Sequence, residues 1–67
     1  MRQIAVTGND DFNFHTWTVY VNQKNEYGER RFTDEGDLLI DVQELYSIVS
    51  DMLKVPADRM VIHNYHV

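Results

Sequence analysis

The sequence predicts an α+β fold, a small antiparallel sheet of three or four strands with one amphipathic helix packed on one face. Two observations carry this prediction. Aromatic and β-branched residues alternate over residues 12–21, and apolar residues recur at helical spacing over residues 42–53. The expected order of elements is β-β-α-β, with or without an extra N-terminal strand. A chain of 67 residues is expected to form one domain over residues 1–67.

The segment 12–21 is the clearest strand in the sequence. Alternation sorts its side chains onto two faces, with Trp17, Val19 and Val21 on one and Thr16, Thr18 and Tyr20 on the other. Residues 4–6 are a candidate first strand, and residues 8–11 have the composition of a turn. After a polar loop over residues 22–28, we expect residues 29–32 to return antiparallel to the long strand as a hairpin.

The helix that follows has an apolar face at a spacing of about 100° per residue, formed by Val42, Leu45, Tyr46, Val49, Met52 and Leu53. Its start has two alternatives. Asp41 with Glu44 forms a capping box, whereas a cap at Asp37 would add Leu38 and Leu39 to the helix. Pro56 prevents continuation, so the helix should end near Leu53. Residues 60–67 alternate as a closing strand.

Composition narrows the classes of function. The chain has 11 Asp plus Glu against 6 Lys plus Arg and a formal charge of -5, which disfavours direct binding to nucleic-acid phosphates. It has no cysteine, which excludes disulfides, thiolate metal sites and thiol catalysis, and fits a cytoplasmic setting. The apolar stretch at residues 4–6 is too short for a signal peptide or a membrane span. A domain this small often gains stability by self-association, so a homodimer is expected.

No constellation of catalytic or metal-ligating residues is recognisable. On a strand, His63 and His66 would lie on opposite faces, and His15 has no neighbouring carboxylate at chelating spacing. Ser47 and Ser50 fall on the polar face of the helix, outside any Gly-flanked nucleophile elbow. The glycines are isolated and form no phosphate loop. We therefore expect no catalytic residue, no cofactor and no metal, and a protein that acts by binding.

The predicted partner-binding residues are five acids that precede and begin the helix, with no basic residue between Thr33 and Lys54: Asp34, Glu35, Asp37, Asp41 and Glu44. One interpretation is a solvated loop with favourable acids at a helix N-terminus. The other joins them with Asp10, Asp11 and Asp51 in a negative surface that meets the basic groove of a nucleic-acid-binding protein. Two aromatic residues, Trp17 and Tyr27, are the candidate interface anchors.

The acids from Asp34 to Glu44 and the order of elements resemble small acidic bacteriophage-encoded inhibitors of host proteins, including DNA-mimicking ones. This resemblance implies an inhibitor that occupies the basic surface of a host nucleic-acid-binding protein in the host cytoplasm. The alternative is a regulatory interaction module that binds by edge-strand addition or aromatic anchors, with the acids serving only solubility. An enzyme or ligand carrier would require a pocket with converging polar groups.

Overall fold

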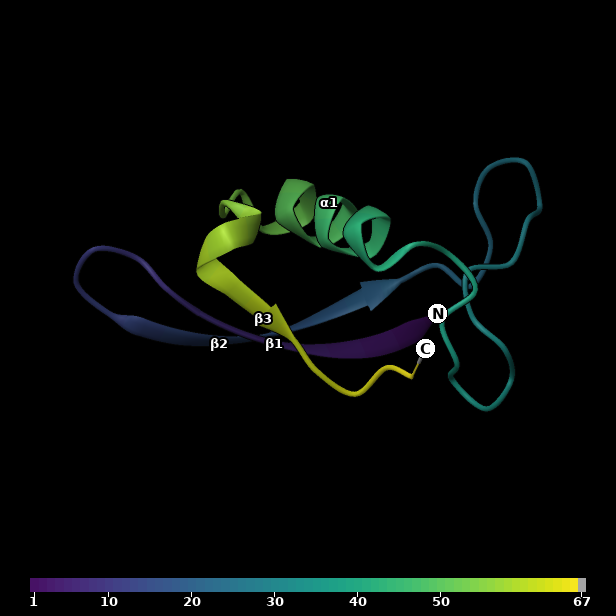
Figure 1. Ribbon diagram of the computed structural model, residues 1–67, viewed down its shortest axis with the longest axis horizontal. Helices are drawn as coiled ribbons and strands as arrows, with labels where there is room; N and C mark the ends of the chain where they lie inside the picture. Colours follow the sequence, from purple (N-terminus) through teal and green to yellow (C-terminus); the bar gives the residue numbers. More distant parts are fainter. Residues whose placement is uncertain (67) are drawn as a thin grey trace.

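The structure, a computed structural model that describes residues 1–66, confirms the α+β class. Its elements are β1 (Arg2–Asn9), β2 (Phe14–Val21), α1 (Val42–Leu53), a short 3-10 helix η1 (Ala57–Arg59) and β3 (Met60–Ile62). The strands form one antiparallel sheet in the order β2-β1-β3, and α1 lies along one face of it (Figure 1). No helix among the described residues has the length and apolar character needed to cross a membrane.

A hairpin joins β1 to β2. The N-terminal strand β1 lies at the centre of the sheet, between β2 and β3. All eight residues of β1 pair in register, from Arg2 with Val21 to Asn9 with Phe14. The prediction that residues 29–32 form a strand paired with β2 is wrong, because that segment makes only isolated bridges within the loop region. Residues 10–13 close the β1–β2 hairpin with a shorter loop than residues 22–28 would need, and loop closure costs less entropy when the loop is short.

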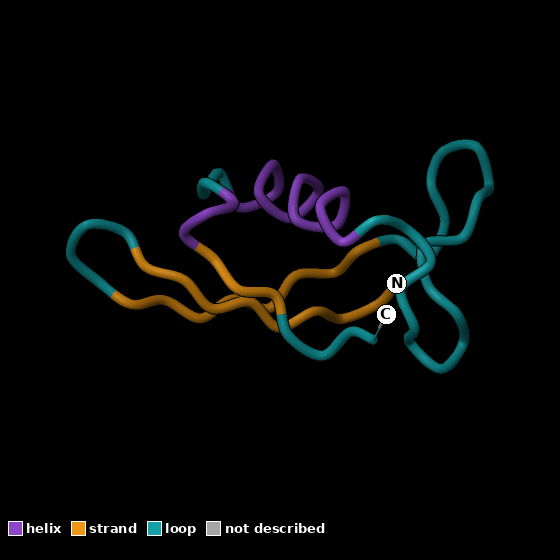
Figure 2. The backbone as a smooth tube through the Cα atoms, viewed as in Figure 1, coloured by secondary structure: helices purple, strands orange, loops and turns teal. Residues whose placement is uncertain are grey.

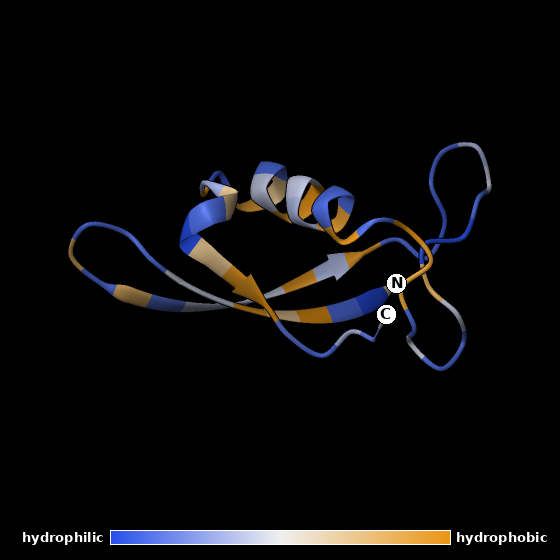
Figure 3. Cartoon of the chain, viewed as in Figure 1, coloured by the Kyte–Doolittle hydropathy of each residue, from blue (hydrophilic) through white to orange (hydrophobic). Residues whose placement is uncertain are grey.

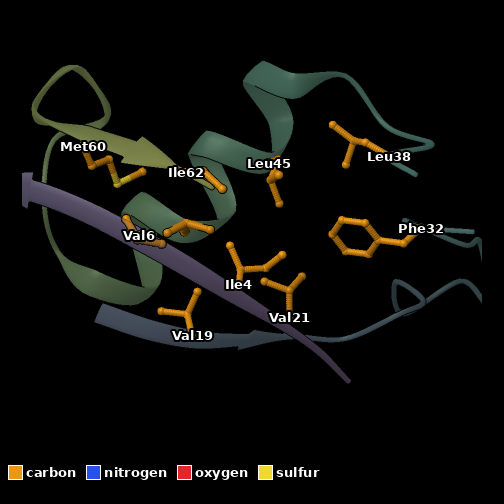
Figure 4. Packing of buried hydrophobic residues seen from close by; sticks show 10 residues of the cluster. Ile4, Val6, Val19, Val21, Phe32, Leu38, Leu45, Met60 and Ile62 are labelled. Atoms are coloured by element: carbon orange, nitrogen blue, oxygen red, sulfur yellow. The ribbon is translucent and has the colours of Figure 1, made fainter. Parts of the chain in front are cut away.

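The core lies between the sheet and α1 and receives side chains from every strand, from the helix and from the connecting loop (Figure 4): Ile4, Val6, Val19, Val21, Phe32, Leu38, Leu45, Val49, Met60 and Ile62. Val19 and Val21 are buried while Thr16, Thr18 and Tyr20 are exposed, which confirms the predicted alternation of β2. Phe32 is fully buried although it belongs to no strand. The rest of the segment between β2 and α1 is largely hydrophilic (Figure 3).

The helix begins after Asp41, whose carboxylate accepts a hydrogen bond from the Gln43 N–H at 2.8 Å. The longer helix capped by Asp37 is therefore wrong, and Leu38 is instead buried where it bridges to the loop segment. Val49 is fully buried, as predicted. The prediction for Met52 is wrong, because its side chain remains 49% exposed in the last turn, where cover by the sheet is incomplete.

The closing strand is shorter than predicted and ends at Ile62. Asn64 adopts a φ of 53°, which turns the backbone away from the sheet. Its side chain continues the hydrogen bonding to β1 in place of the backbone. The Ala5 N–H donates to Asn64 Oδ1 at 2.8 Å, and Asn64 Nδ2 donates to the Gln3 carbonyl at 3.1 Å. Val67, the end of the predicted strand, lies outside the described residues.

Candidate functional site

The outer side of β2 is an open edge of the sheet. Among residues 1–66, β2 pairs only with β1. The direction of its backbone groups follows from Ala5, which donates to Asn64 Oδ1 and accepts from the His63 N–H at 2.8 Å. Both groups of Ala5 thus point towards β3. Its partner Thr18 in β2 is therefore in a non-hydrogen-bonded pair, and the Thr18 N–H and C=O point outwards.

Alternation along an antiparallel strand gives every second residue of β2 the same direction. The N–H and C=O groups of four residues therefore point outwards: Phe14, Thr16, Thr18 and Tyr20. At about 3.4 Å per residue, the row extends over roughly 20 Å. The side chains of the same residues lie on the sheet face opposite the core, where Phe14 is 70% and Tyr20 is 52% exposed. A polypeptide laid along this edge would meet both the backbone row and these side chains.

At the opposite edge of the sheet, the outward N–H donors of β3 are satisfied within the chain. The His63 N–H points towards β1, where it donates to the Ala5 carbonyl, so by alternation the outward donors of β3 are the N–H groups of Met60 and Ile62. The Met60 N–H donates to the Ala57 carbonyl of η1. The Ile62 N–H donates to the Tyr46 hydroxyl of α1 at 3.1 Å. The fold therefore covers the donors of one edge and leaves those of the other edge open.

The sequence of β2 carries none of the usual protection of an edge strand. Natural edge strands are shielded by Lys or other charged side chains, by proline, by bulges or by being very short. β2 has eight residues, FHTWTVYV, with no acidic residue, no lysine or arginine, no proline and an unbroken register. Its one basic side chain, His15, belongs to the alternate set that faces the helix side. Such an edge is typical of a strand that pairs with another chain.

The hairpin loop next to this edge is ordered by Asp10. Its carboxylate accepts hydrogen bonds from His15 Nε2 at 2.9 Å and from the N–H groups of Phe12 and Asn13 at 2.8 and 2.7 Å. These bonds, the one from His15 first, lower the pKa of Asp10 from 3.8 to about 2. The hairpin returns the chain so that His15 meets Asp10, a single hydrogen-bonded pair that belongs to no group of three metal-ligating side chains among residues 1–66. The His15 ring also stacks on Trp17, with centroids 5.4 Å apart.

Two small clefts lie on the described part of the surface. One of about 160 Å³ lies beside Trp17, Pro56 and Arg59. The other, of about 270 Å³, lies between Arg31 and Glu44 and is mostly polar. Pockets for small molecules usually measure about 300–1,000 Å³. Within residues 1–66, no three His, Asp or Glu side chains come together in a way that could hold a metal ion. The β2 edge is a larger binding feature than either cleft.

The structure exposes the five predicted acidic residues, Asp34, Glu35, Asp37, Asp41 and Glu44. It also brings cations among them. Arg30 pairs with Asp34 at 2.6 Å. The Arg2 guanidinium packs against Gly36, where a Cβ would come within 2.6 Å of its Nη2, between two of the acids. Asp41 is engaged in capping the helix. The acids thus form a surface of mixed charge around the start of α1.

The two predicted aromatic anchors have different surroundings. Tyr27 is 82% exposed in the loop between β2 and α1. Trp17 is half-buried against the core and stacked on His15, so its ring already has partners. The exposed aromatic residues of the edge, Phe14 and Tyr20, were missed as candidates. The alternation of β2 would have found Tyr20, since it places that residue on the face opposite Trp17.

Comparison with known proteins finds no relative of this chain. No protein-family model, no curated protein and no solved structure matches it. The resemblance to small acidic bacteriophage-encoded inhibitors therefore remains a prediction from size, charge and the order of elements.

Proposed function

We propose that this protein is an interaction module that binds another polypeptide by β-strand addition along the outer edge of β2. The observation that carries this proposal is the row of outward N–H and C=O groups at four alternate residues, from Phe14 to Tyr20. In strand addition, main-chain hydrogen bonds supply much of the affinity and alternate side chains supply specificity. The exposed side chains of Phe14 and Tyr20 stand at the two ends of the row.

The energies show why the edge needs these aromatic side chains. Four residues with two bonds each can make eight hydrogen bonds, and a net 0.5–1.5 kcal/mol for each gives about 4–12 kcal/mol. Association costs an estimated 4–15 kcal/mol in lost freedom. The free energy gained from the backbone hydrogen bonds alone is therefore close to the cost of association. Burial of Phe14 and Tyr20 by the added strand supplies the favourable difference, because aromatic side chains bury much area with few rotatable bonds.

The experiment that tests this proposal removes one outward donor without touching the ladder to β1. Thr18→Pro deletes an N–H that points away from β1, and proline is tolerated at such positions of an edge strand. Thr18→Val keeps the N–H and is the matched control. A random-peptide display library is selected on the wild type and then tested on both variants. We expect the selected peptides to bind Thr18→Val and to fail on Thr18→Pro; equal binding to all three would refute strand addition.

A second candidate function rests on the exposure of the five acids and the net charge of -5. In it, the acidic surface occupies the basic groove of a nucleic-acid-binding protein, as an inhibitor would. The test replaces Asp34, Glu35 and Asp37 by Asn, Gln and Asn and compares pull-downs from bacterial lysate eluted with stepped salt. A basic protein that is released at moderate salt and lost with the variant supports this candidate. Retention of the same partners by the variant removes it.

A further inference from the structure

We infer that the strand added to β2 is the β2 strand of a second copy, so that two chains form a continuous six-stranded sheet around a two-fold axis. This inference rests on the proposed function and names its partner. Two β2 strands related by a two-fold axis run antiparallel, and such an interface uses the same patch on both copies. Such pairing requires β2 to be complementary to itself, and the pattern of its outward N–H and C=O groups meets this requirement.

The outward N–H and C=O groups of β2 favour one register for the pairing of two β2 strands. Hydrogen-bonded pairs must join outward residues of both copies, which here are the even-numbered residues 14 to 20. Placing the axis at Trp17 pairs Phe14 with the partner's Tyr20 and Thr16 with the partner's Thr18. All four outward residues of each copy then take part, with two bonds in each of four pairs. An axis at Thr16 or at Thr18 would use only three residues of each copy.

The side chains in this register complement one another on the face opposite the helix. An aromatic pair, Phe14 with the partner's Tyr20, stands at each end, and a threonine pair stands on each side of the axis. Aromatic pairs and threonine pairs are among the cross-strand combinations that stabilise antiparallel sheets. β2 contains no carboxylate, lysine or arginine, so the charge of -5 on each copy places no like charges directly opposite one another.

The hairpin loop of residues 10–13 lies at the end of β2, and its two acids already have partners in their own chain, Asp10 in His15 and Asp11 in Arg59. The hairpin extends beyond α1, as Figure 2 shows, so this end of β2 is free of the helix. The second copy would approach in the plane of the sheet, whereas α1 lies above one face of it.

The covered β3 edge explains why pairing would stop at two copies. An open sheet with two free edges can grow by adding chains at both sides. Here the outward donors of β3 already bind the Ala57 carbonyl and the Tyr46 hydroxyl. After β2 pairs with its own copy, both remaining edges of the six-stranded sheet are β3 edges. No outward β3 donor is then left to bind a further chain, which favours a dimer over a growing sheet.

The oligomeric state is measured by sedimentation equilibrium over a range of protein concentrations, for the wild type, Thr18→Pro and Thr18→Val. We expect a wild-type dimer, and a self-association constant at least about five-fold lower for Thr18→Pro, because the two-fold axis removes the donor twice. Thr18→Val should associate as the wild type does. Circular dichroism checks that each variant is folded. A folded wild type that remains a monomer, or equal association of all three proteins, would overturn the inference.

The register is tested by disulfide formation, which the cysteine-free chain makes simple to interpret. Thr16→Cys and Thr18→Cys are oxidised separately and as a mixture. Directly opposite residues lie within the Cα separation of about 4.4–6.8 Å that a disulfide allows. We expect the mixed disulfide, between a thiol at position 16 and one at position 18, to be the main product. Predominant crosslinking of either variant with itself would contradict the axis at Trp17.

The two proposals fail in different ways. If the wild type is a monomer but library peptides still bind it and not Thr18→Pro, the second copy is wrong as the partner and strand addition stands. If peptides bind the wild type and Thr18→Pro equally, strand addition itself is wrong. A dimer that is unaffected by Thr18→Pro would place self-association on another surface and would overturn the second-copy inference.

Discussion

The Tyr46 hydroxyl gives a direct test of how the β3 edge is closed. Tyr46→Phe removes the acceptor of the Ile62 N–H and keeps the ring that packs against the core. Ile62 is buried, so its N–H has little access to water after the substitution. Leaving a buried donor without a partner costs about 1–3 kcal/mol. In a domain of this size, each kcal/mol lowers the melting temperature by roughly 4–8 °C.

The assay is thermal unfolding followed by circular dichroism, together with amide hydrogen exchange of Ile62 measured by NMR. We expect a melting temperature lower by at least about 4 °C and faster exchange at Ile62 in Tyr46→Phe. The control is Tyr27→Phe, which removes a hydroxyl from an exposed loop residue and should change neither quantity. If Tyr46→Phe unfolds at the temperature of the wild type and Ile62 keeps its protection, the hydroxyl does not close this edge.

Three further predictions concern the core, the sheet and the hairpin loop. Val49→Ala should lower the free energy of unfolding by about 1–3 kcal/mol, because the side chain is fully buried beneath the helix; an unshifted melting curve would contradict this packing. Gly8→Ala should destabilise by about 1–3 kcal/mol, since its Cβ would lie 2.6 Å from the Arg59 carbonyl oxygen, and a variant as stable as the wild type would show that the backbones are not so close. Because folding lowers the pKa of Asp10 from 3.8 to about 2, the stability it supplies is present above about pH 4 and is lost as the pH falls towards 2. Asp10→Asn should flatten the acid dependence of the melting temperature in that window, and an unchanged acid profile would contradict the pKa shift.

Local patterns predicted the buried faces of β2 and α1. The alternation of β2 and the spacing of Leu45 and Val49 each reflect which face of an element is buried, and that information is contained in a short stretch of sequence. The cap at Asp41 was one of two alternatives with similar local chemistry. The choice between them depends on Leu38, which is buried outside the helix against the loop segment.

Strand pairing could not be predicted in the same way. Periodicity says which face of β2 is buried but not which strand lies beside it, and both residues 10–13 and residues 22–28 contain turn-forming residues. The open edge follows only from the strand order β2-β1-β3. One of the two bonds that close the other edge joins Ile62 to Tyr46 across 16 positions and has no local signature.

The position of the charges also depended on tertiary structure. The acids from Asp34 to Glu44 lie close together in the sequence with no basic residue between them, but Arg2 reaches their loop from the far N-terminus and packs against Gly36. Arg2 also lies over the Phe32 ring at 5.6 Å and donates to the Asn64 carbonyl at 2.7 Å. A run of like charges in a sequence therefore does not establish a surface of one sign.

The most direct test of strand addition is amide hydrogen exchange along β2, measured by NMR in the dilute free protein and again in the assembled state. In the free protein, we expect protection at His15, Trp17 and Val19, whose N–H groups point to β1, and fast exchange at Thr16 and Thr18. On assembly, the outward amides should become protected as well, so that the alternation disappears. Fast exchange at Thr16 and Thr18 in the assembled state, or protection of both in the dilute free protein, would contradict the account.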